Sequence, residues 1–441
     1  MQVSPNGHPA PNFEAPATNS AQLDSTRRAR QRALCIAALA DGEDLAELGE
    51  LLRTVGVGVA GELIQHREKP HPNTYLGPGK VAQAKAAASA CDATLVACDD
   101  ELSARQERNL EQELGLPVVD RTTVILDIFA SHAHTAEGKL QVELAQLEYN
   151  MARMRGLWNH LERLGGGIGT RGPGETQIET DRRLARNRIA ALRRRLEHVK
   201  GTRTVQRAER ERAALPTIAL VGYTNAGKST LLNALTDAEV GVGDRLFHTL
   251  DPTTRILRGP GDGHVPRPCL LTDTVGFISK LPHQLVDAFG ATLEETRRAD
   301  LLAHVLDGGV ADAQAQTMCR SVEQTLEEIG AGERPRLLVL NKVDRLDQAA
   351  RHDLRLRYPD AVHVSAATGE GLQELCERFE QELLHTLRPV ELLVPYTDGA
   401  SLAELHKIAG RLNREDTAEG VLVRALLPAG LVARFERFAI A

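Results

Sequence analysis

The sequence TIALVGYTNAGKSTLLNAL, residues 217–235, joins a short apolar run, a glycine-containing loop and an apolar helical run. Within it, residues 222–229 read G-x-x-x-x-G-K-S. Glycines let backbone amides close around an anion, the lysine supplies a positive charge, and the amino end of the following helix adds its dipole. The stretch therefore predicts a phosphate-binding loop at the carboxyl end of a parallel strand.

Further apolar runs at 269–273, 301–307, 336–341 and 361–366 alternate with helical sequence. This alternation predicts an α/β domain over 214–387, with a doubly wound parallel sheet and ligands at the carboxyl ends of its strands. A glycine turn with only a structural role is the alternative interpretation of the loop. The strand and helix on either side of it argue against that alternative.

Residues of the phosphate loop have separate expected roles. Gly222 and Gly227 would let the backbone wrap the β-phosphate. Lys228 would neutralise the β and γ oxygens, and the Ser229 hydroxyl would bind Mg²⁺. The nucleotide-binding residues expected here are Gly222, Tyr223, Thr224, Asn225, Ala226, Gly227, Lys228 and Ser229.

The sequence NKVD at 341–344 follows the apolar run RLLVL and predicts the bound base. The Asp344 carboxylate can accept hydrogen bonds from N1–H and the N2 amine of guanine, a donor pair that adenine lacks. We expect Asn341 to hold the surrounding loops and the Lys342 stem to lie over the ring. Backbone amides of the SAA sequence would meet the guanine O6, so the base-binding set is Asn341, Lys342, Val343, Asp344, Ser365, Ala366 and Ala367.

Two segments between these motifs are expected to meet the γ-phosphate and Mg²⁺. In DTVGF, 273–277, Asp273 would hold the ion through water and the Gly276 amide would sense the γ-phosphate. In FHTLDPTTR, 247–255, Thr249 is the expected Mg²⁺ ligand by resemblance to GTPases with an F-x-T-L pattern; Thr253 is its rival, and an ordinary loop is the alternative. The expected contacts are Phe247, His248, Thr249, Leu250, Asp251, Asp273, Thr274, Val275 and Gly276, with Lys228, Thr249 and Gly276 as the catalytic residues and Ser229 and Thr249 as the metal ligands.

Phe277 stands where many signalling GTPases have a glutamine that orients the attacking water. We therefore expect slow hydrolysis by the protein alone, with the water ordered by backbone, an ion or a partner. Asn225 resembles the asparagine of potassium-requiring GTPases, which makes K⁺ a second candidate ion.

Residues 139–213 differ from the rest of the chain. Leu140, Leu144, Leu147, Met151, Met154, Trp158 and Leu161 recur in steps of four and three. After a glycine-rich sequence, GGGIGTRGPG, at 165–174, a second helical run carries Leu184, Ile189, Leu192, Leu196 and Val199. This pattern predicts a long antiparallel αα-hairpin with a glycine-rich tip. Between Lys139 and Arg212 there are 17 Lys and Arg against 9 Asp and Glu, although the whole chain carries a net charge of −7. The surplus predicts contact with a polyanion, with Arg163, Arg171, Arg182 and Arg183 in or beside the tip; a solvated helix surface with a flexible turn is the alternative.

The remaining sequence is less informative. Of 441 residues, 42% are hydrophobic, enough for several domains. We expect a disordered tail at 1–30, a small α/β domain at 31–138 and a small α+β domain at 388–441. GPGK at 77–80 is either a second nucleotide loop or a turn that starts a helix, and the turn is favoured because the rest of a phosphate-loop pattern is missing. The six scattered cysteines favour buried thiols in a reducing cytosol, and no apolar run reaches the length of a membrane span. We therefore expect a cytoplasmic protein, with peripheral membrane association left open, and we also expect a monomer.

Together, GGGIGTRGPGETQIETDRR, GYTNAGKST, FHTLDPTTR, DTVGFI and NKVD resemble, in this order, the HflX family of ribosome-associated GTPases over residues 30–387. The resemblance implies a P-loop GTPase that hydrolyses GTP to GDP and phosphate. It also implies that the first domain and the hairpin bind the large ribosomal subunit, the tip reaching towards the peptidyl transferase centre, and that the protein dissociates stalled or idle ribosomes. A GTP-gated protein switch whose hairpin binds protein or dimerises is the alternative.

Overall fold

The computed structural model describes residues 31–39, 44–67, 69–164, 180, 182–199, 215–236, 246–247, 249–250, 252–258, 269–280, 290–385, 387–409 and 412–440. The predicted tail, the glycine-rich tip at 165–174 with Arg171, the side chain of Arg163, and His248 and Asp251 lie outside the described residues. Contacts divide the chain into two compact units, Met1–Asp99 with Gln106–Arg121, and Asp100–Arg105 with Thr122–Ala441.

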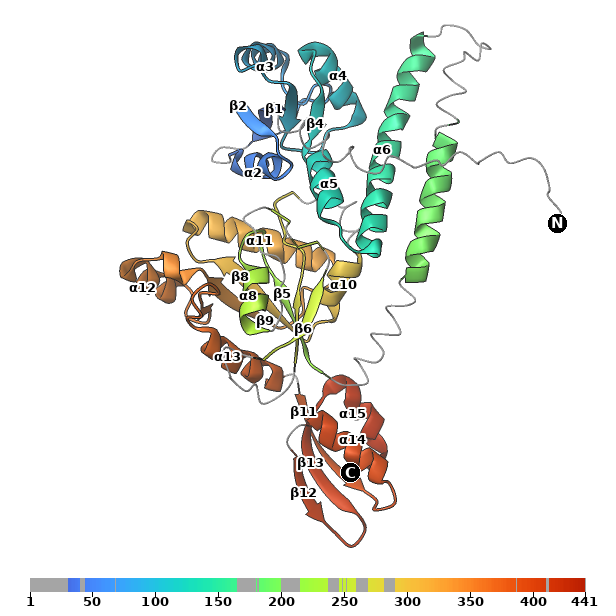
Figure 1. The fold of residues 1–441 in the computed structure, drawn as a ribbon, viewed down its shortest axis with the longest axis vertical. Coiled ribbons are helices and arrows are strands. Elements are labelled where there is room, and N and C mark those ends of the chain that lie inside the picture. Colours follow the sequence, from blue (N-terminus) through green and yellow to red (C-terminus); the bar gives the residue numbers. More distant parts are fainter. Residues whose placement is uncertain are drawn as a thin grey trace, which may run out of the picture. The chain divides into compact units, whose positions relative to one another are not determined.

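The first unit contains a parallel four-stranded sheet in the order β2-β1-β3-β4 (Figure 1). Its strands are β1 (Arg32–Leu39), β2 (Gly58–His66), β3 (Leu95–Cys98) and β4 (Val118–Asp120), and its helices are α2 (Ala46–Thr54), α3 (Pro78–Ala90) and α4 (Ala104–Leu114). The GPGK sequence lies at the start of α3, where Gly77 caps the helix and Pro78 occupies its first turn. Proline suits that position because its missing N–H has no helical partner there.

A six-stranded sheet in the order β10-β9-β8-β5-β7-β6 forms the nucleotide domain. Its strands are β5 (Thr217–Val221), β6 (Thr253–Ile256), β7 (Leu270–Asp273), β8 (Leu301–Asp307), β9 (Arg336–Asn341) and β10 (Val362–His363). The described pairings are parallel except that β6 runs antiparallel to β7. The sheet is therefore mixed and not wholly parallel, and Thr253 lies on a strand rather than in the predicted loop.

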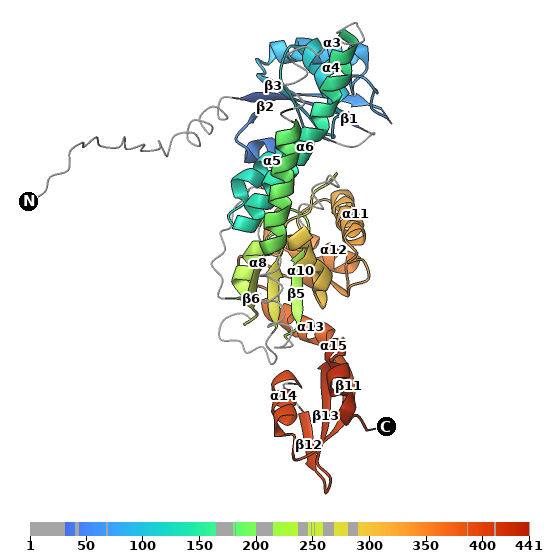
Figure 2. The same cartoon turned by 90° about the vertical axis from the view of Figure 1, so that its right-hand side faces the viewer.

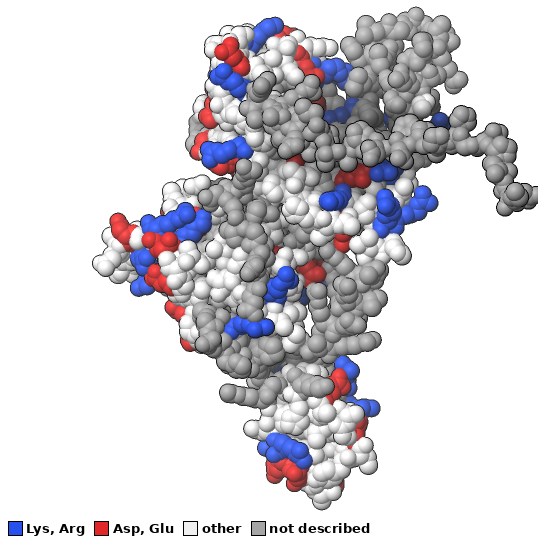
Figure 3. Space-filling view, in the orientation of Figure 1, with Lys and Arg blue, Asp and Glu red and all other residues white. Residues whose placement is uncertain are grey.

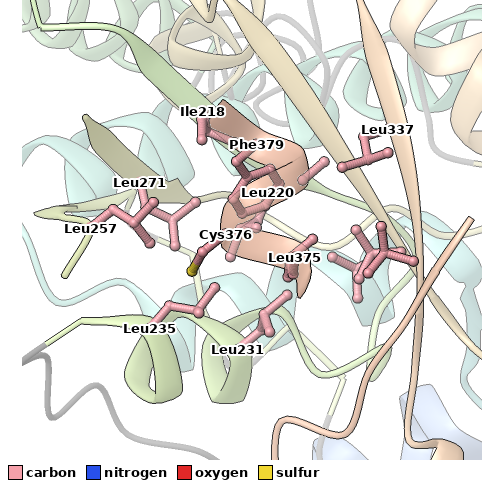
Figure 4. Packing of buried hydrophobic residues seen from close by; sticks show 14 of the residues in the cluster. Ile218, Leu220, Leu231, Leu235, Leu257, Leu271, Leu337, Leu375, Cys376 and Phe379 are labelled. Atoms are coloured by element: carbon pink, nitrogen blue, oxygen red, sulfur yellow. The ribbon is translucent and has the colours of Figure 1, made fainter. Parts of the chain in front are cut away.

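Helices cover both faces of this sheet. They are α8 (Lys228–Leu235), α10 (Gly290–Arg298), α11 (Asp312–Glu328), α12 (Gln348–Arg357) and α13 (Leu372–His385), with a short 3-10 helix, η1, at Val343–Arg345. Leucines of α8 and the apolar side of α13 pack against one face, as Figure 4 shows for Leu231, Leu235 and Phe379. Ala315 of α11 and Leu354 of α12 pack on the other face against Leu306 and Leu340. Burial of α8 holds the phosphate loop, which immediately precedes it, at a fixed strand end.

Helix α5 (Arg121–His132) leads into α6 (Ala136–Leu164), and a further helix spans 182–199. Ion pairs between Arg188 and Glu143 and between Arg193 and Glu148 join that helix to α6. Its residues Ile189, Leu192 and Leu196 are buried, but Leu184, predicted for the packed seam, is 58% exposed. On α6 the predicted leucines at 140, 144 and 147 and Met151 are half-buried, whereas Val142, Ala145 and Tyr149 are buried. Side chains of the later seam positions, from Met154 onward, lie outside the described residues.

The carboxy-terminal part forms an antiparallel sheet in the order β11-β13-β12. Its strands are β11 (Leu387–Val394), β12 (Leu412–Asp416) and β13 (Val421–Pro428). Helices α14 (Gly399–Ala409) and α15 (Ala429–Phe435) lie on one face and enclose a core of their own, and a 3-10 helix, η2, follows at Glu436–Phe438 (Figure 2). No helix in the described residues is long and apolar enough to cross a membrane. All six cysteines are free thiols, four of them buried.

Candidate functional site: a nucleotide pocket at the strand ends

The phosphate loop needs its glycines for two different reasons. Gly222 has a φ of 147°, and a Cβ there would lie 2.2 Å from the carbonyl oxygen of Val305. Gly227, which caps α8, has a φ of 91°, and a Cβ there would meet the Asn341 amide nitrogen at 2.3 Å. Larger side chains at either position would therefore meet both backbone strain and an occupied neighbouring position. The loop is held in one shape by the strands beside it.

Lys228 is buried at the start of α8. Its ammonium group donates to the carbonyl oxygens of Gly222, at 3.0 Å, and Tyr223, at 2.8 Å. Burial lowers the pKa of Lys228 to about 8, and the negative charge of Asp273 opposes that shift. A cation held in a site with little water acts strongly on a phosphate placed against it. Lys228 thus has the position and charge that its expected role needs.

Three oxygen-bearing side chains meet next to Lys228. Ser229 Oγ lies 2.6 Å from Asp273 Oδ2 and 2.7 Å from Thr249 Oγ1. Burial raises the pKa of Asp273, while Lys228 and the hydroxyls of Ser229 and Thr249 lower it. The second carboxylate oxygen, Oδ1, is buried and has no hydrogen-bond partner among the described residues. Hard oxygen donors around an unsatisfied buried carboxylate fit a Mg²⁺ ion, which the GTPase fold implies together with its nucleotide.

The base-binding motif is anchored to the phosphate loop. Asn341 donates through Nδ2 to the Ala226 carbonyl at 2.9 Å and accepts through Oδ1 from the Ala366 amide at 3.0 Å. Lys342 Nζ reaches the Asn225 carbonyl at 2.6 Å and the Asp307 carboxylate at 2.8 Å. Asp344, which is exposed, lines the same pocket as Ala366 and Ala367. Motifs that are far apart in the sequence therefore line one pocket.

Phe277 does not face this pocket. Its side chain is 1% exposed, and it is absent from the residues that line the pocket. Its backbone pairs with Tyr223, because the Phe277 amide donates to the Gly222 carbonyl and the Thr224 amide donates to the Phe277 carbonyl. The position following Gly276 therefore supplies hydrophobic packing, and no side chain from it can orient water.

Most of the predicted site residues in the described part of the chain come together. The pocket is lined by Thr224, Asn225, Gly227, Lys228, Ser229, Thr230, Phe247, Thr249, Thr274, Gly276, Asn341, Lys342, Asp344, Arg345, Ala366 and Ala367. Among the described residues, the predicted ones that do not line it are Gly222, Tyr223, Ala226, Leu250, Asp273, Val275, Val343 and Ser365. Thr253, the rival metal ligand, lines no part of the pocket.

Two lining residues, Thr230 and Arg345, were not predicted. Each directly follows a recognised motif, GKS and NKVD respectively. Their adjacency to those motifs was the signal in the sequence, because a residue next to a binding motif in the chain also lies close to it in space.

Comparison with known proteins agrees with this geometry. Residues 42–130, 132–210 and 217–342 match the families described as GTP-binding GTPase N-terminal, GTP-binding GTPase Middle Region and 50S ribosome-binding GTPase. GTPase HflX of Lacrimispora saccharolytica is 46% identical over 418 residues, covering 93% of this chain and 97% of that protein. GTPase HflX of Escherichia coli is 50% identical over 355 residues, covering 79% and 82%. A GTP-binding protein from Sulfolobus solfataricus, solved in complex with GDP, is 26% identical with a TM-score of 0.41, covering 80% and 99%.

The mixed sheet, the phosphate loop and the pocket between them define a P-loop GTPase, an enzyme that hydrolyses GTP to GDP and phosphate. Among P-loop GTPases, the relatives that match most of this chain are GTPases named HflX. The chain belongs to the HflX family of GTPases.

Proposed function

We propose that this GTPase binds the large ribosomal subunit through its basic hairpin and dissociates stalled or idle ribosomes in the cytoplasm. The observation that carries the proposal is the helix at 182–199, which has seven arginines and one glutamate. Figure 3 shows blue side chains gathered over the middle of this helix. The family description 50S ribosome-binding GTPase supports the same partner.

Five of the seven arginines of this helix fall into two groups. Arg188 and Arg193 are paired with glutamates of α6 and so help to hold the two helices together. Arg183, Arg186 and Arg195 are exposed and form no ion pair with any described residue. Exposed guanidinium groups on a rigid helix can each pair with a phosphate of structured RNA, and their release of counterions makes such binding salt-dependent. The second group is therefore the proposed RNA-binding surface.

Co-sedimentation with purified large subunits tests this surface. We expect the protein to pellet with large subunits in a GTP analogue more than in GDP, and less as salt rises. Replacing Arg183, Arg186 and Arg195 by alanine should reduce the slope of log affinity against log salt by about 2 to 3. The matched control replaces three exposed arginines elsewhere, Arg297, Arg320 and Arg355. Equal salt slopes for the two triple variants would refute the surface.

Ribosome dissociation is tested through the glycine-rich tip, which lies outside the described residues. Glycine lets a backbone approach crowded RNA where larger side chains would clash. Replacing 165–174 with a serine linker should abolish dissociation, measured by light scattering of ribosomes, while GTP binding is retained. Full dissociating activity of the variant would show that the tip is a dispensable turn.

The alternative function is a protein switch that uses the hairpin to dimerise. We propose a monomer, because the exposed arginines would repel one another across a two-fold contact. Sedimentation equilibrium over a range of protein concentrations decides between them. A concentration-dependent dimer that ignores ribosomes would favour the alternative.

For the site itself we propose that Asp344 selects guanine, that Gly276 contacts the γ-phosphate, and that Ser229 and Thr249 are the Mg²⁺ ligands. The contact between Ser229 and Thr249 supports the last assignment. We also propose that K⁺ binds beside Asn225, which has a φ of 59° and lines the pocket. Turnover in K⁺ should exceed turnover in Na⁺ at equal ionic strength, and Asn225→Ala should remove the difference.

A further inference from the structure

The phosphate loop and the segment after Gly276 are joined by contacts that the nucleotide motifs do not explain. The Phe277 amide donates to the Gly222 carbonyl at 3.0 Å, and the Thr224 amide donates to the Phe277 carbonyl at 2.8 Å. Two residues further on, the Ser279 amide donates to the Tyr223 hydroxyl at 2.7 Å, and the two side-chain hydroxyls also lie 2.7 Å apart. Tyr223 thus holds Ser279 through two hydrogen bonds across 56 positions of sequence.

This strap, formed by residues 222–224 with Phe277 and Ser279, encloses Gly276. A Cβ on Gly276 would lie 2.7 Å from Thr224 Cγ2 and 3.1 Å from Lys228 Nζ. On the other side, Thr274 Oγ1 donates to the Leu220 carbonyl at 2.7 Å. Gly276 is therefore fixed from both directions against the phosphate loop, next to the lysine that faces the phosphates.

The strap also shares an acceptor with Lys228. The Gly222 carbonyl receives hydrogen bonds from both the Phe277 amide and the Lys228 ammonium group. Any movement of the segment after Gly276 therefore changes the surroundings of Lys228 as well. The Tyr223 hydroxyl is thus connected through Ser279 to the segment beside Gly276, and that segment shares the Gly222 carbonyl with Lys228.

We propose that Tyr223 is a positioning residue for the Gly276 amide, acting through Ser279, and that it sets the preference of this GTPase for GTP over GDP. The inference rests on the proposed contact of Gly276 with the γ-phosphate but not on the ribosomal role. GDP has no γ-phosphate, so its affinity does not depend on where that amide lies. Without the strap, GTP binding must also order the segment, which costs conformational entropy.

The direct test is Tyr223→Phe, which keeps the ring and removes the hydroxyl. Affinities for fluorescent GDP and for a fluorescent non-hydrolysable GTP analogue are measured with the full-length protein without ribosomes. We expect the affinity for the GTP analogue to fall about 5- to 10-fold and the GDP affinity to stay within about twofold. We also expect kcat to fall together with the affinity for the GTP analogue. Tyr396→Phe is the matched control, because it likewise removes a tyrosine hydroxyl that is hydrogen-bonded to the backbone, here by donating to the Thr417 carbonyl in the carboxy-terminal part of the chain.

Variants at Ser279 and Gly276 separate the possible outcomes. Ser279→Thr should retain the preference for the GTP analogue, and Ser279→Ala should lose part of it. Gly276→Ala should remove the preference. If Gly276→Ala removes it but Tyr223→Phe does not, the strap is refuted while the γ-phosphate contact stands. An equal loss of GDP and analogue affinity in Tyr223→Phe would make the tyrosine a general structural residue and overturn the proposal.

Discussion

The nucleotide pocket and the helix at 182–199 use positive charge in opposite ways. In the pocket, Lys228 is buried, and each of its hydrogen bonds goes to a fixed backbone carbonyl. On the helix, Arg183, Arg186 and Arg195 are exposed and unpaired among the described residues. A buried charge acts at one point with high directionality, whereas exposed charges act together and are screened by salt. Changes in the pocket should therefore have large, specific effects, and changes on the helix smaller and additive ones.

Removing the buried cation should have the largest effect. Lys228→Ala should lower turnover on the order of 100- to 1000-fold, because Lys342, a second lysine that lines the pocket, is held by the Asn225 carbonyl and the Asp307 carboxylate. Steady-state hydrolysis measured alongside Lys85→Ala, which removes an exposed lysine of α3, provides the comparison. Near-normal turnover in Lys228→Ala would contradict the expectation that changes in the pocket have larger effects than changes on the helix.

Changing the base selector should have the next largest effect. Asp344→Asn should lower GTP affinity about 100-fold, because the amide cannot accept both guanine donors. It should also raise xanthosine triphosphate affinity, since the amide donates to the C2 carbonyl of xanthine. Competition binding with both nucleotides measures the exchange. Unchanged GTP affinity would mean that Asp344 does not contact the base.

A third prediction concerns a buried histidine, His304, whose uncharged form is favoured in the folded protein. His304, on β8 between Val221 and Leu338, has a buried Nε2 with no hydrogen-bond partner in the described residues. Burial lowers its pKa from 6.5 to about 4, and Arg336 and Lys228 add to the shift. Between these values the unfolded chain binds a proton that the folded chain does not. The contribution of His304 to the free energy of unfolding is therefore fully present above pH 6.5 and decreases as the pH falls towards 4.

For that group we expect a loss of about 2 kcal/mol between pH 7.5 and pH 5.0. Urea unfolding of the nucleotide-free protein at the two pH values measures it. His304→Leu should remove most of this dependence, while His352→Gln, at an exposed position, should not. If the pH dependence survives in His304→Leu, another group is responsible for it.

The smallest effect is expected on the helix. Single replacements of Arg183, Arg186 or Arg195 by alanine should each weaken binding to large subunits a few-fold and reduce the salt slope by roughly one. The effect of Arg195→Ala should add to that of either other replacement, because nine or more residues of helix, roughly 13 Å, separate Arg195 from Arg183 and Arg186. Titration by fluorescence anisotropy at several salt concentrations checks this. A loss of all binding in one single variant would mean that this arginine occupies a specific pocket on the subunit.

Sequence alone allowed much of the pocket to be predicted, because its motifs act through backbone conformation close in sequence. GYTNAGKST contains its own turn and helix start, and NKVD stands at a strand end that its apolar run already indicates. The misses had different causes. Strand β6 exists through its pairing with β7, a distant partner. Leu184 stands five residues before Ile189, outside the three- and four-residue spacing of the buried positions that follow, and it is exposed. The hydrogen bonds between Tyr223 and Ser279 join residues that nothing local connects.

Binding of RNA by Arg183, Arg186 and Arg195 is expected to accelerate hydrolysis in the pocket, where position 277 offers no side chain that could orient water. The most direct measurement is GTP turnover by the purified protein with and without large subunits, for the parent and for the triple variant at Arg183, Arg186 and Arg195. We predict that both proteins hydrolyse GTP slowly without subunits. At low protein concentration, large subunits should strongly accelerate turnover by the parent but not by the triple variant. Fast turnover of the parent alone, unchanged by large subunits, would contradict the account.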